Sequence, residues 1–384
     1  MEIIQRSFVN CRDPVEIPQR FSGDDSPQNT QTPPMFMIMH RLLFLLLPAA
    51  ALVPLSRFQV HDKILEDGEA KIEAKVLLNT ENGEHATVLS GWGGKLELLQ
   101  LVGKEGLRDV IYNHNGNATL IQKDSSPGAV LCPFSNRVAN GTYTWNGKTH
   151  YLNRNSANNA IHGFLIGGQP MEVAQISSDD SHAAVTLSYT FGGEEGYPFN
   201  VSFELTYTLD SNGLQVKGKA ENIMADRSAP FMLGLHPYFK VKDVSKTVVT
   251  FDQCSKWNHV DVTPAPDLIP IGTTTPVKRP FDGSSPIGGN ITHPTHFDDG
   301  FKAISSRRHC PKLTTKIRDD QDVLKLWMDD SFRFLQIYTG APDKGVAVEP
   351  QAGETDCWNN KDSVIALQAG EIWEGSFGFS IEAL

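Results

Sequence analysis

The chain has 384 residues, of which 40% are hydrophobic and 21% charged, and its formal net charge is −11. This composition is typical of a globular protein that is long enough for one large domain or two small ones. Nucleic-acid binding depends on clustered Lys and Arg, and the acidic balance without any basic run argues against it, whereas a small neutral substrate fits.

The first 56 residues have the composition of two segments that precede the globular part. Residues 1–34 are polar and contain prolines without apolar periodicity, which predicts a disordered extension or a start codon placed too early. Residues 35–56 hold a short cationic head, an apolar run at 42–47 and small residues after Pro48, the order of a secretory signal peptide. Because the run is short for a membrane span, we expect a cleaved signal, no stable membrane insertion, and a protein that is secreted or lies in the secretory-pathway lumen. A signal anchor, or a buried strand or helix, is the alternative.

Two further features fit an oxidising compartment. Four tripeptides match the acceptor pattern for N-glycosylation, at Asn117, Asn140, Asn200 and Asn290. Without the leader the chain keeps an even number of cysteines, which is compatible with disulfide bonds: Cys132, Cys254, Cys310 and Cys357. A chain of this length does not need disulfides to fold, so buried free thiols are the alternative.

The region 57–384 is rich in short strand-like segments. Residues 201–209 alternate strictly between apolar and polar side chains, which predicts a half-buried antiparallel strand. Similar segments, separated by turn clusters such as Asp210-Ser-Asn-Gly213, occur at 71–79, 96–102, 183–191, 214–222, 323–328, 334–339 and 377–381. No stretch keeps a helical period, and no linker or internal repeat interrupts the region. We therefore predict one all-β domain over 57–384, built as a large antiparallel sandwich.

An acidic residue, Glu349, stands out near the C-terminus. It follows an apolar, strand-like run and precedes Pro350, so we expect its carboxylate at the end of a rigid element, where side chains rarely serve packing alone. With the ordinary pKa of a Glu, about 4.3, it would be ionised near neutrality and able to act as a general base. A surface or salt-bridged Glu at a strand end is the structural alternative.

Three more motifs precede this residue: Asn136-Arg-Val-Ala-Asn-Gly141, His162-Gly163 and His236-Pro-Tyr-Phe239. Together with Glu349-Pro-Gln351 they resemble, in the same order, the motifs of the aldose 1-epimerase (galactose mutarotase) family, and the resemblance runs from about Glu84 to the C-terminus. It implies a single-domain β-supersandwich with its site in the concave face of one sheet, and the interconversion of α and β anomers of free hexoses such as glucose or galactose. That reaction needs one base and one acid, so no cofactor is expected.

The resemblance also implies a role for each matching residue. Glu349 matches the base, and His236 matches the acid, whose imidazole ordinarily titrates near pH 6.5. Four residues match the positions that hold the sugar: Arg137, His162, Asp298 and Asn136. Each has a structural alternative as well. His236 could satisfy a buried backbone group, Arg137 could form a structural carboxylate pair, and Asn136 could be a turn residue.

The acidic ligand is the least distinct of these residues. In the family an Asp three residues before a Phe binds sugar hydroxyls, which selects Asp298 rather than Asp299 because Phe301 follows at that spacing. The same stretch, with His293 and His296, could instead hold a metal ion. Its Pro and Gly content indicates a loop, and no further ligand is placed nearby, so we expect no metal site.

Two departures from the family pattern concern the substrate. Pro237 stands where the best-known galactose mutarotases have Ser, and Phe164 is closer to the hexose-6-phosphate epimerase branch. Apart from Arg137 the motif regions hold no arginine that would clamp a phosphate, so free hexoses are favoured. Other classes are a non-catalytic, lectin-like sandwich and a glycoside-processing enzyme with Glu349 and Asp298 as its two carboxylates. We expect a sugar as the small-molecule partner and a monomer or weak dimer.

Overall fold

The computed structural model describes residues 56–277, 280–290, 293–294, 296–304 and 312–383. They belong to one compact unit that extends from Pro54 to Leu384. Its regular structure is almost entirely β-strand, and all ladders between its named strands are antiparallel, as the alternating sequence predicts. The all-β prediction is confirmed. The predicted segment 1–34, and all of 35–56 except its last residue, lie outside the described residues.

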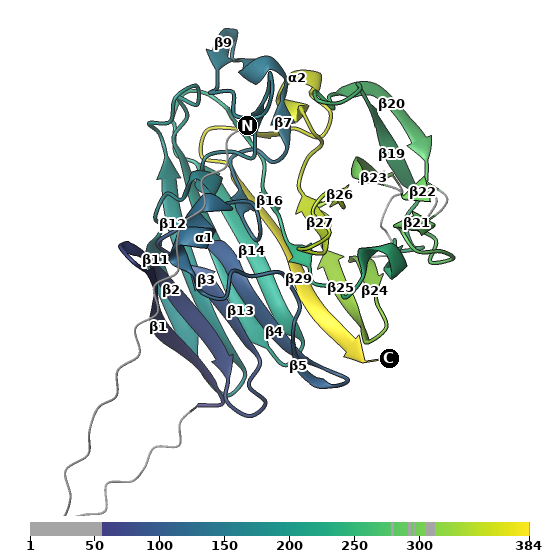
Figure 1. The fold of residues 1–384 in the computed structure, drawn as a ribbon. Helices are drawn as coiled ribbons and strands as arrows, with labels where there is room; N and C mark the ends of the chain where they lie inside the picture. The colour runs from purple at the N-terminus through teal and green to yellow at the C-terminus, as the bar shows by residue number, and fades with distance from the viewer. Residues whose placement is uncertain (1–55, 278–279, 291–292, 295, 305–311, 384) are drawn as a thin grey trace, which may run out of the picture. The chain divides into compact units, whose positions relative to one another are not determined.

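Most strands belong to three large sheets (Figure 1). The five-stranded sheet has the order β1 (Phe58–Asp67), β2 (Ala70–Asn79), β3 (His85–Leu89), β4 (Lys95–Gly103) and β5 (Gly106–Asp109). The first eight-stranded sheet has the order β11 (Glu172–Ser178), β12 (His182–Phe191), β13 (Val201–Asp210), β14 (Gly213–Asn222), β29 (Ile372–Ala383), β25 (Asp322–Met328), β24 (Leu313–Arg318) and β18 (Val248–Thr250). The second has the order β20 (Pro270–Pro276), β19 (Trp257–Val262), β23 (Asp298–Ala303), β26 (Phe334–Tyr338), β27 (Val346–Gln351), β16 (Gly234–Leu235) and β6 (Val130–Leu131), with β17 (Tyr238–Phe239) also paired to β27.

Smaller elements decorate these sheets. Four two-stranded pairs are formed by β7 (Arg137–Val138) with β10 (Ala160–Ile161), β8 (Thr142–Trp145) with β9 (Lys148–Tyr151), β15 (Ala229–Phe231) with β28 (Ile365–Leu367), and β21 (Gly289–Asn290) with β22 (His293–Pro294). The described helices are short: α1 (Ala118–Lys123), α2 (Cys357–Asn360), and the 3-10 turns η1 (Ala139–Gly141), η2 (Leu165–Gly167) and η3 (Val244–Lys246). Across the described ranges, no helix has both the length and the apolar character needed to cross a membrane.

The hairpin of β13 and β14 illustrates how the sequence pattern becomes structure. Along β13 the apolar residues are buried and the intervening polar residues are half-buried. Asp210 pairs with Gly213 across a two-residue turn, and Gly213 has a φ of 109°, which a side chain would strain. Its added Cβ would also lie 2.2 Å from the carbonyl oxygen of Phe379. The turn therefore fixes the register that places the apolar face inward.

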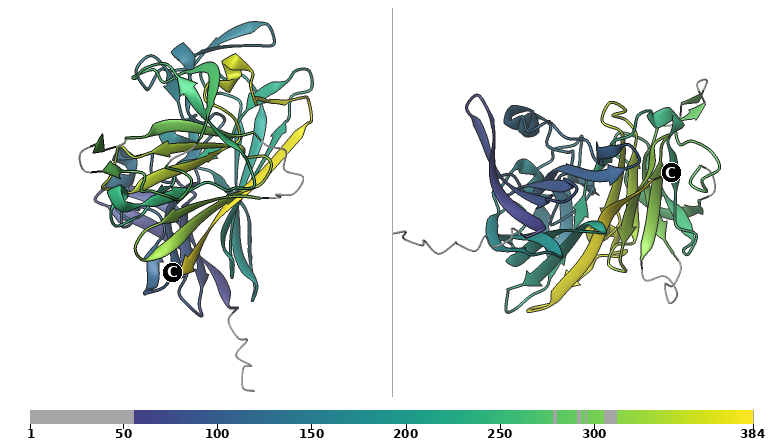
Figure 2. Two further views of the ribbon diagram at one scale, coloured as in Figure 1. Left: turned by 90° about the vertical axis from the view of Figure 1, so that its right-hand side faces the viewer. Right: turned by 90° about the horizontal axis from the view of Figure 1, so that it is seen from below.

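The main core lies where the five-stranded sheet packs on the first eight-stranded sheet. Strands β1 and β2 contact β12, and β4 contacts β29, so the purple and blue strands of the N-terminal sheet lie against the teal and yellow strands in Figures 1 and 2. Fully buried side chains from both sheets, among them Leu77, Leu99, Leu205 and Phe203, belong to one hydrophobic cluster. Burial of apolar surface on this scale is the main source of folding free energy. The two packed sheets form a rigid unit, and the second eight-stranded sheet lies beside it.

The cysteines divide into two kinds. Cys254 is disulfide-bonded, whereas Cys132 and Cys357 are free and buried. Cys357 donates its thiol hydrogen to the sulfur of Met232 at 3.0 Å. Cys132 and Cys357 therefore fit the alternative of buried free thiols, whereas Cys254 fits the disulfide bonding with which the even cysteine count is compatible. Cys310 lies outside the described residues.

Candidate active site

A cavity on the second eight-stranded sheet contains every residue that the motifs select. Its volume is about 260 Å³, close to the lower limit of about 300 Å³ for small-molecule sites. Its lining consists of Ser126, Asn136, Arg137, Ile161, His162, His236, Tyr238, Asp298, Gln336, Tyr338 and Glu349. Seven separate segments of the chain thus meet at one place, and each contributes at least one polar side chain.

Glu349 lies inside β27 rather than at the end of a strand. The strand continues through Pro350 to Gln351, and Glu349 pairs with Gln336 of the adjacent β26. The expectation that Pro350 ends the element is wrong. On the other side of β27 the ladder is interrupted between β16 and β17, and a strand residue without an N–H is tolerated where a ladder is incomplete. The central position of β27 explains why the Glu349 side chain is only 2% exposed.

Burial changes the protonation expected for Glu349. Loss of water around the carboxyl group raises its pKa well above the ordinary value, and the nearby Asp298 carboxylate raises it further. The side-chain amide of Gln351, which donates to Oε2 at 3.2 Å, and the charge of Arg137 oppose this rise. Burial thus favours the protonated form of Glu349 to a higher pH than its ordinary pKa would allow.

His236 occupies the short arch between β16 and β17, directly beside Glu349. Its Nε2 lies 3.4 Å from Oε1 of Glu349, and both side chains are buried. The backbone of His236 exchanges two hydrogen bonds with the segment before β6, donating to Ala129 and accepting from Gly128. Burial lowers the pKa of the imidazole to about 4, so at neutral pH this ring is neutral.

His162 and Asn136 hold each other in strained conformations at the edge of the cavity. Both have positive φ values, 70° for His162 and 54° for Asn136, and the amide of His162 donates to the carbonyl of Asn136 at 3.0 Å. The His162 ring makes an edge-to-face contact with His236, with the ring centroids 5.3 Å apart. Burial lowers the pKa of His162 well below its ordinary value, and His236 and Arg137 lower it further. Backbone strain of this kind is often maintained at ligand sites.

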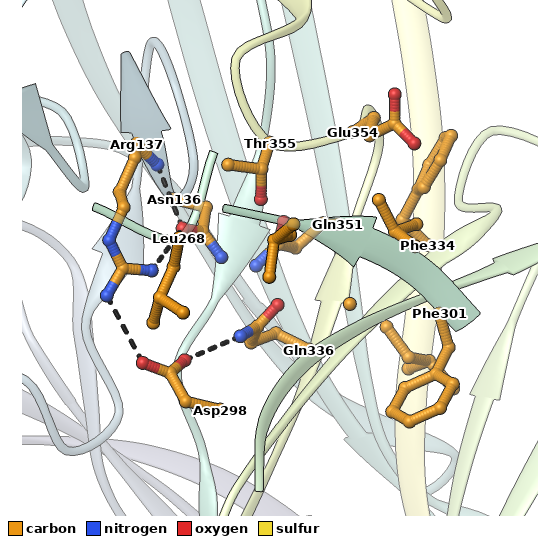
Figure 3. A pocket seen from close by; sticks show the side chains of 14 residues that line it. Asn136, Arg137, Leu268, Asp298, Phe301, Phe334, Gln336, Gln351, Glu354 and Thr355 are labelled. Carbon is orange, nitrogen blue, oxygen red and sulfur yellow. Dashed lines mark hydrogen bonds and ion pairs between the residues drawn. The ribbon is translucent and has the colours of Figure 1, made fainter. Parts of the chain in front are cut away.

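Arg137 and Asp298 form a polar wall between β7 and β23. Asn136 Oδ1 accepts hydrogen bonds from the Arg137 backbone amide at 2.9 Å and from Nη1 at 3.1 Å, while Nη2 of Arg137 donates to Asp298 Oδ2 at 3.2 Å. The other oxygen of Asp298 accepts from Nε2 of Gln336 at 2.7 Å. Figure 3 shows this chain of hydrogen bonds from Asn136 to Gln336. It fixes the Asp298 carboxylate on two sides, with a third of its side chain still exposed.

A second, smaller cavity lies on the far side of this wall. Figure 3 shows its lining, which shares Asn136, Arg137, Asp298 and Gln336 with the first cavity and adds Leu268, Gln351, Glu354, Thr355 and the rings of Phe301 and Phe334. Burial raises the pKa of Glu354 to about 7. The residues of the polar wall therefore line both cavities.

Three residues of the cavity carry no recognisable sequence signal. Gln336 lies in the middle of the apolar strand β26, Tyr338 ends the same strand, and Ser126 lies in the segment after α1. Strand alternation would have placed Gln336 and Tyr338 on one face together with Phe334, without indicating which face holds a ligand. The missing information is the pairing of β26 with β27, which sets Gln336 opposite Glu349.

The carboxylates of the alternative metal site at 293–299 have other partners in the structure. Asp299 binds Nε2 of His259 at 2.7 Å, and Asp298 binds Arg137 and Gln336. Among the described residues there is no group of three or more His, Cys, Asp and Glu side chains that could hold a metal ion. The side chain of His293 lies outside the described residues.

Phe164, one of the two departures from the family pattern, lies on the core side of the site. Its ring packs against Phe134, Phe191 and Tyr197, with centroid separations of 6.0, 6.5 and 6.1 Å, and it does not line the cavity. Pro237 accepts a hydrogen bond from the amide of Val348 through its carbonyl oxygen. Neither departure adds a charged group to the cavity.

Comparison with known proteins agrees with this geometry. Residues 74–380 match the family model described as aldose 1-epimerase. Galactose mutarotase of Rattus norvegicus is 28% identical over 305 residues, covering 76% of this chain and 80% of the rat protein. Two crystal structures share the fold at 18% identity: an aldose epimerase homologue from C. elegans, with a TM-score of 0.68 over 84% of this chain and 100% of the other, and a galactose 1-epimerase from Lactobacillus acidophilus, with a TM-score of 0.67 over 85% and 99%. The chain therefore belongs to the aldose 1-epimerase family of isomerases, as its four motifs predict.

Proposed function

We propose that the cavity interconverts the α and β anomers of free hexoses such as glucose or galactose, with Glu349 and His236 as its acid–base pair. The observation that carries this proposal is the 3.4 Å separation of Glu349 Oε1 and His236 Nε2 inside a cavity lined by hydrogen-bonding side chains. Binding alone does not require an acid beside a base, so this pair separates the proposal from a lectin-like function.

The reaction needs two coordinated proton transfers at the anomeric centre. A base removes the proton of the C1 hydroxyl, an acid protonates the ring oxygen, and the bond between C1 and that oxygen breaks to give the open-chain aldehyde. Rotation about the bond between C1 and C2 presents the other face of the carbonyl. Ring closure then reverses the two transfers, and each positioned group contributes a rate increase of about 10²–10⁴-fold.

The directions of the two pKa shifts suit one half of this cycle. They favour a protonated Glu349 and a neutral His236, so the pair shares one transferable proton. This is the state in which Glu349 can return a proton to O1 while His236 accepts one from O5, as in ring closure. Transfer of that proton from Glu349 to His236 gives the carboxylate and the imidazolium needed for ring opening, with no change in net charge.

The remaining polar residues suit the binding of sugar hydroxyls. Arg137 supplies guanidinium donors, and Asp298, held by Arg137 and Gln336, supplies carboxylate acceptors on an already fixed group. Because both oxygens of Asp298 are engaged, it is poorly suited to be the second carboxylate of a glycoside-cleaving enzyme, whose acid must carry a proton.

Charge in the cavity favours a neutral sugar over a sugar phosphate. Apart from its two histidines, the lining holds one cation, Arg137, and it is already paired with Asp298. Glu349 and Asp298 add acidic groups to the same lining. A phosphate would bring at least one further negative charge without a free partner, which is costly in a buried site.

We infer in addition that the protein passes through the secretory pathway. The sequence of the leader supports this, and so does the disulfide-bonded state of Cys254, since disulfides are rare in reducing compartments. Among the acceptor asparagines, Asn140 and Asn200 are exposed. Asn117 instead caps α1, accepting the amide of Leu120 at 2.9 Å. The side chain of Asn290 lies outside the described residues.

The test is the rate at which fresh α-glucose and α-galactose reach anomeric equilibrium, followed by polarimetry or NMR exchange with the full chain expressed in a eukaryotic host. We expect a rate well above the spontaneous one for at least one free hexose, and a much smaller effect on glucose 6-phosphate. A rate equal to the buffer control for both free sugars would overturn the proposal, and a preference for the phosphate would overturn the assigned substrate class.

A further inference from the structure

A network of charged side chains lies behind His236, outside the cavity. Tyr238 stacks on the imidazole, with the ring centroids 4.9 Å apart and the planes 17° from parallel. The ammonium group of Lys344 lies 5.6 Å from the centroid of the Tyr238 ring and 5.8 Å from that of Tyr112. Its Nζ is bound by Asp124 Oδ2 at 2.6 Å. The ring of Tyr238 thus lies between the imidazole and a fixed pair of opposite charges.

The ion pair is anchored from the protein interior. His114 bridges two carboxylates, with its Nε2 3.3 Å from Asp124 Oδ2 and its Nδ1 3.1 Å from Glu97 Oε2. Lys95, only 2% exposed, donates to the backbone carbonyl of Asp124 at 3.2 Å. Burial raises the pKa of Asp124 in principle, but Lys344 and His114 together hold it below the ordinary value, so this carboxylate is charged. Because these groups are buried or half-buried, their charges are screened less than surface charges.

Titratable groups approach His236 from every element packed around it. Glu349 comes from β27, His162 from the segment after β10, Tyr238 from β17, Lys344 from the turn before β27, Asp124 from the end of α1 and Lys95 from β4. Lys344 and Lys95 disfavour a positive charge on the imidazole, and Asp124 favours it. Lys344 and Glu349 are carried by the same short stretch of chain, one behind the imidazole and one in front of it.

Substituting Lys344 or Asp124 has a structural effect and an electrostatic effect, and the two can be separated. Each substitution breaks the same bond, so any structural consequence should resemble that of the other. The electrostatic consequences differ in sign, because one substitution removes a positive charge near His236 and the other a negative charge.

We propose that Lys344 and Asp124 are positioning residues for the catalytic proton: by their opposite charges behind Tyr238 they set how readily it moves from Glu349 to His236. This inference concerns the same site as the proposed mutarotase function and rests on that function. The positive charge of Lys344 favours the proton on Glu349. The negative charge of Asp124 lowers the free-energy cost of its transfer to His236. Neither residue touches the substrate cavity.

The experiment is an NMR titration of His236 without substrate. The ring signal is assigned by its loss in H236N, and its pKa is measured in the wild-type protein and in K344M and D124N. We expect K344M to raise this pKa and D124N to lower it, each by about half a pH unit or more. The E349Q background lacks the coupled proton. In it, K344M and D124N should still shift the pKa of His236 in opposite directions. Shifts of both variants in one direction, or no shift in either, would overturn the proposal.

Two further variants test charge and chemistry separately. K344R keeps the positive charge and should leave the pKa of His236 near the wild-type value. K217M removes one positive charge from the exposed pair of Lys217 with Glu374 on the first eight-stranded sheet, and should also leave it unchanged. A shift in K217M as large as that in K344M would assign the effect to net charge alone and overturn the proposal.

The titration is independent of catalysis, so the two proposals can fail separately. If the wild-type protein does not accelerate anomerisation, the proposed function fails while the pKa shifts still test the network. If it does, the acidic limb of the pH profile of kcat/KM should move to higher pH in K344M and to lower pH in D124N. Limbs that move together would point to a structural role and contradict the inference.

Discussion

The carboxyl group of Glu349 and the imidazole of His236 face each other at 3.4 Å, and both are almost completely excluded from water. Dehydration disfavours the charged form of each group, so it raises the pKa of one and lowers that of the other. The two shifts favour a protonated Glu349 beside a neutral His236, so the pair holds one transferable proton that can reside on either side. An acid and a base are available together without either being exposed.

Replacement of Glu349 by Gln should slow anomerisation by about 10²-fold or more, because the amide keeps the shape but accepts no proton. Sugar affinity, measured by calorimetry, should remain close to the wild-type value. Glu354, a buried carboxyl group of the neighbouring cavity, provides the matched control, and E354Q should stay within a few-fold of the wild-type rate. A near-native rate in E349Q would remove Glu349 from the mechanism.

Binding and turnover should separate among the other polar residues. R137A and H162A should raise KM by roughly 10- to 100-fold, the effect expected when a hydrogen bond to a charged or fixed group is lost. H236N should act mainly on kcat, because it removes a proton carrier. Steady-state kinetics of the three variants provide the comparison, and indistinguishable changes in kcat and KM would contradict this division.

The folding stability should depend on pH through Glu349. Its raised pKa means that the native state keeps a proton that the unfolded chain releases above about pH 4.3, so this residue's contribution falls as pH rises toward the folded pKa. His236, with a pKa lowered to about 4 from 6.5, acts in the opposite sense only between those values. Above pH 6.5 the contribution of Glu349 to the free energy of unfolding should therefore decline by at most about 1.4 kcal/mol per pH unit until its folded pKa is reached. Urea denaturation from pH 6.5 to 8.5 should show this decline in the wild-type protein and a weaker one in E349Q; equal slopes would be inconsistent with a buried, protonated Glu349.

Gln336 should matter for substrate affinity although no motif marks it. Q336L keeps the size of the side chain but removes the donor to Asp298, so the affinity for sugar should fall by about 10-fold with a smaller change in kcat. Gln100 makes the same kind of bond to Asp109, at 2.7 Å, outside the cavity. Q100L should therefore leave the kinetics unchanged, and an equal loss in both variants would indicate a general effect on stability.

The acceptor asparagines should differ in occupancy if the protein enters the secretory pathway. Asn140 and Asn200 are exposed, whereas the Asn117 side chain is committed to capping α1. Expressed in a eukaryotic host, the mature chain should begin between Ala51 and Val60 and lose mass on glycosidase treatment. N140Q and N200Q should each remove one glycan, and N117Q none. An unglycosylated chain beginning at Met1 would contradict the proposed route, though not the chemistry.

The strands were predictable because their information is local. Alternation at 201–209 and its neighbours anticipates β13, β12 and β14 almost residue for residue, since a period of two leaves one consistent face to bury. The site residues were predictable only through their motifs. Alternation alone gives Glu349 no special status, and Pro350 wrongly suggests a strand end, because the local sequence does not reveal that β27 has neighbours on both sides.

What the sequence could not supply is the environment of each group. The ordinary pKa values suggest an ionised Glu349 and a His236 that titrates near pH 6.5, whereas burial raises the pKa of Glu349 and lowers that of His236 to about 4, because water exclusion depends on the whole cavity. Gln336 was missed for a related reason. Its importance arises from pairing between β26 and β27 and from contact with Asp298 on a third strand, and neither relationship is written in any single segment.

The two sides of β27 are reached by very different paths along the chain. Strand β26 precedes it across a short turn, whereas β16 and β17 are separated from it by the whole of residues 240–345. Closing a short loop costs little conformational entropy, while closing a long one costs more and is slower. Glu349 can thus join its local hairpin early in folding, but the arch that carries His236 must dock across the long connection. The acid and the base meet only when that docking is complete, so catalysis reports a long-range contact of the fold rather than the local hairpin alone.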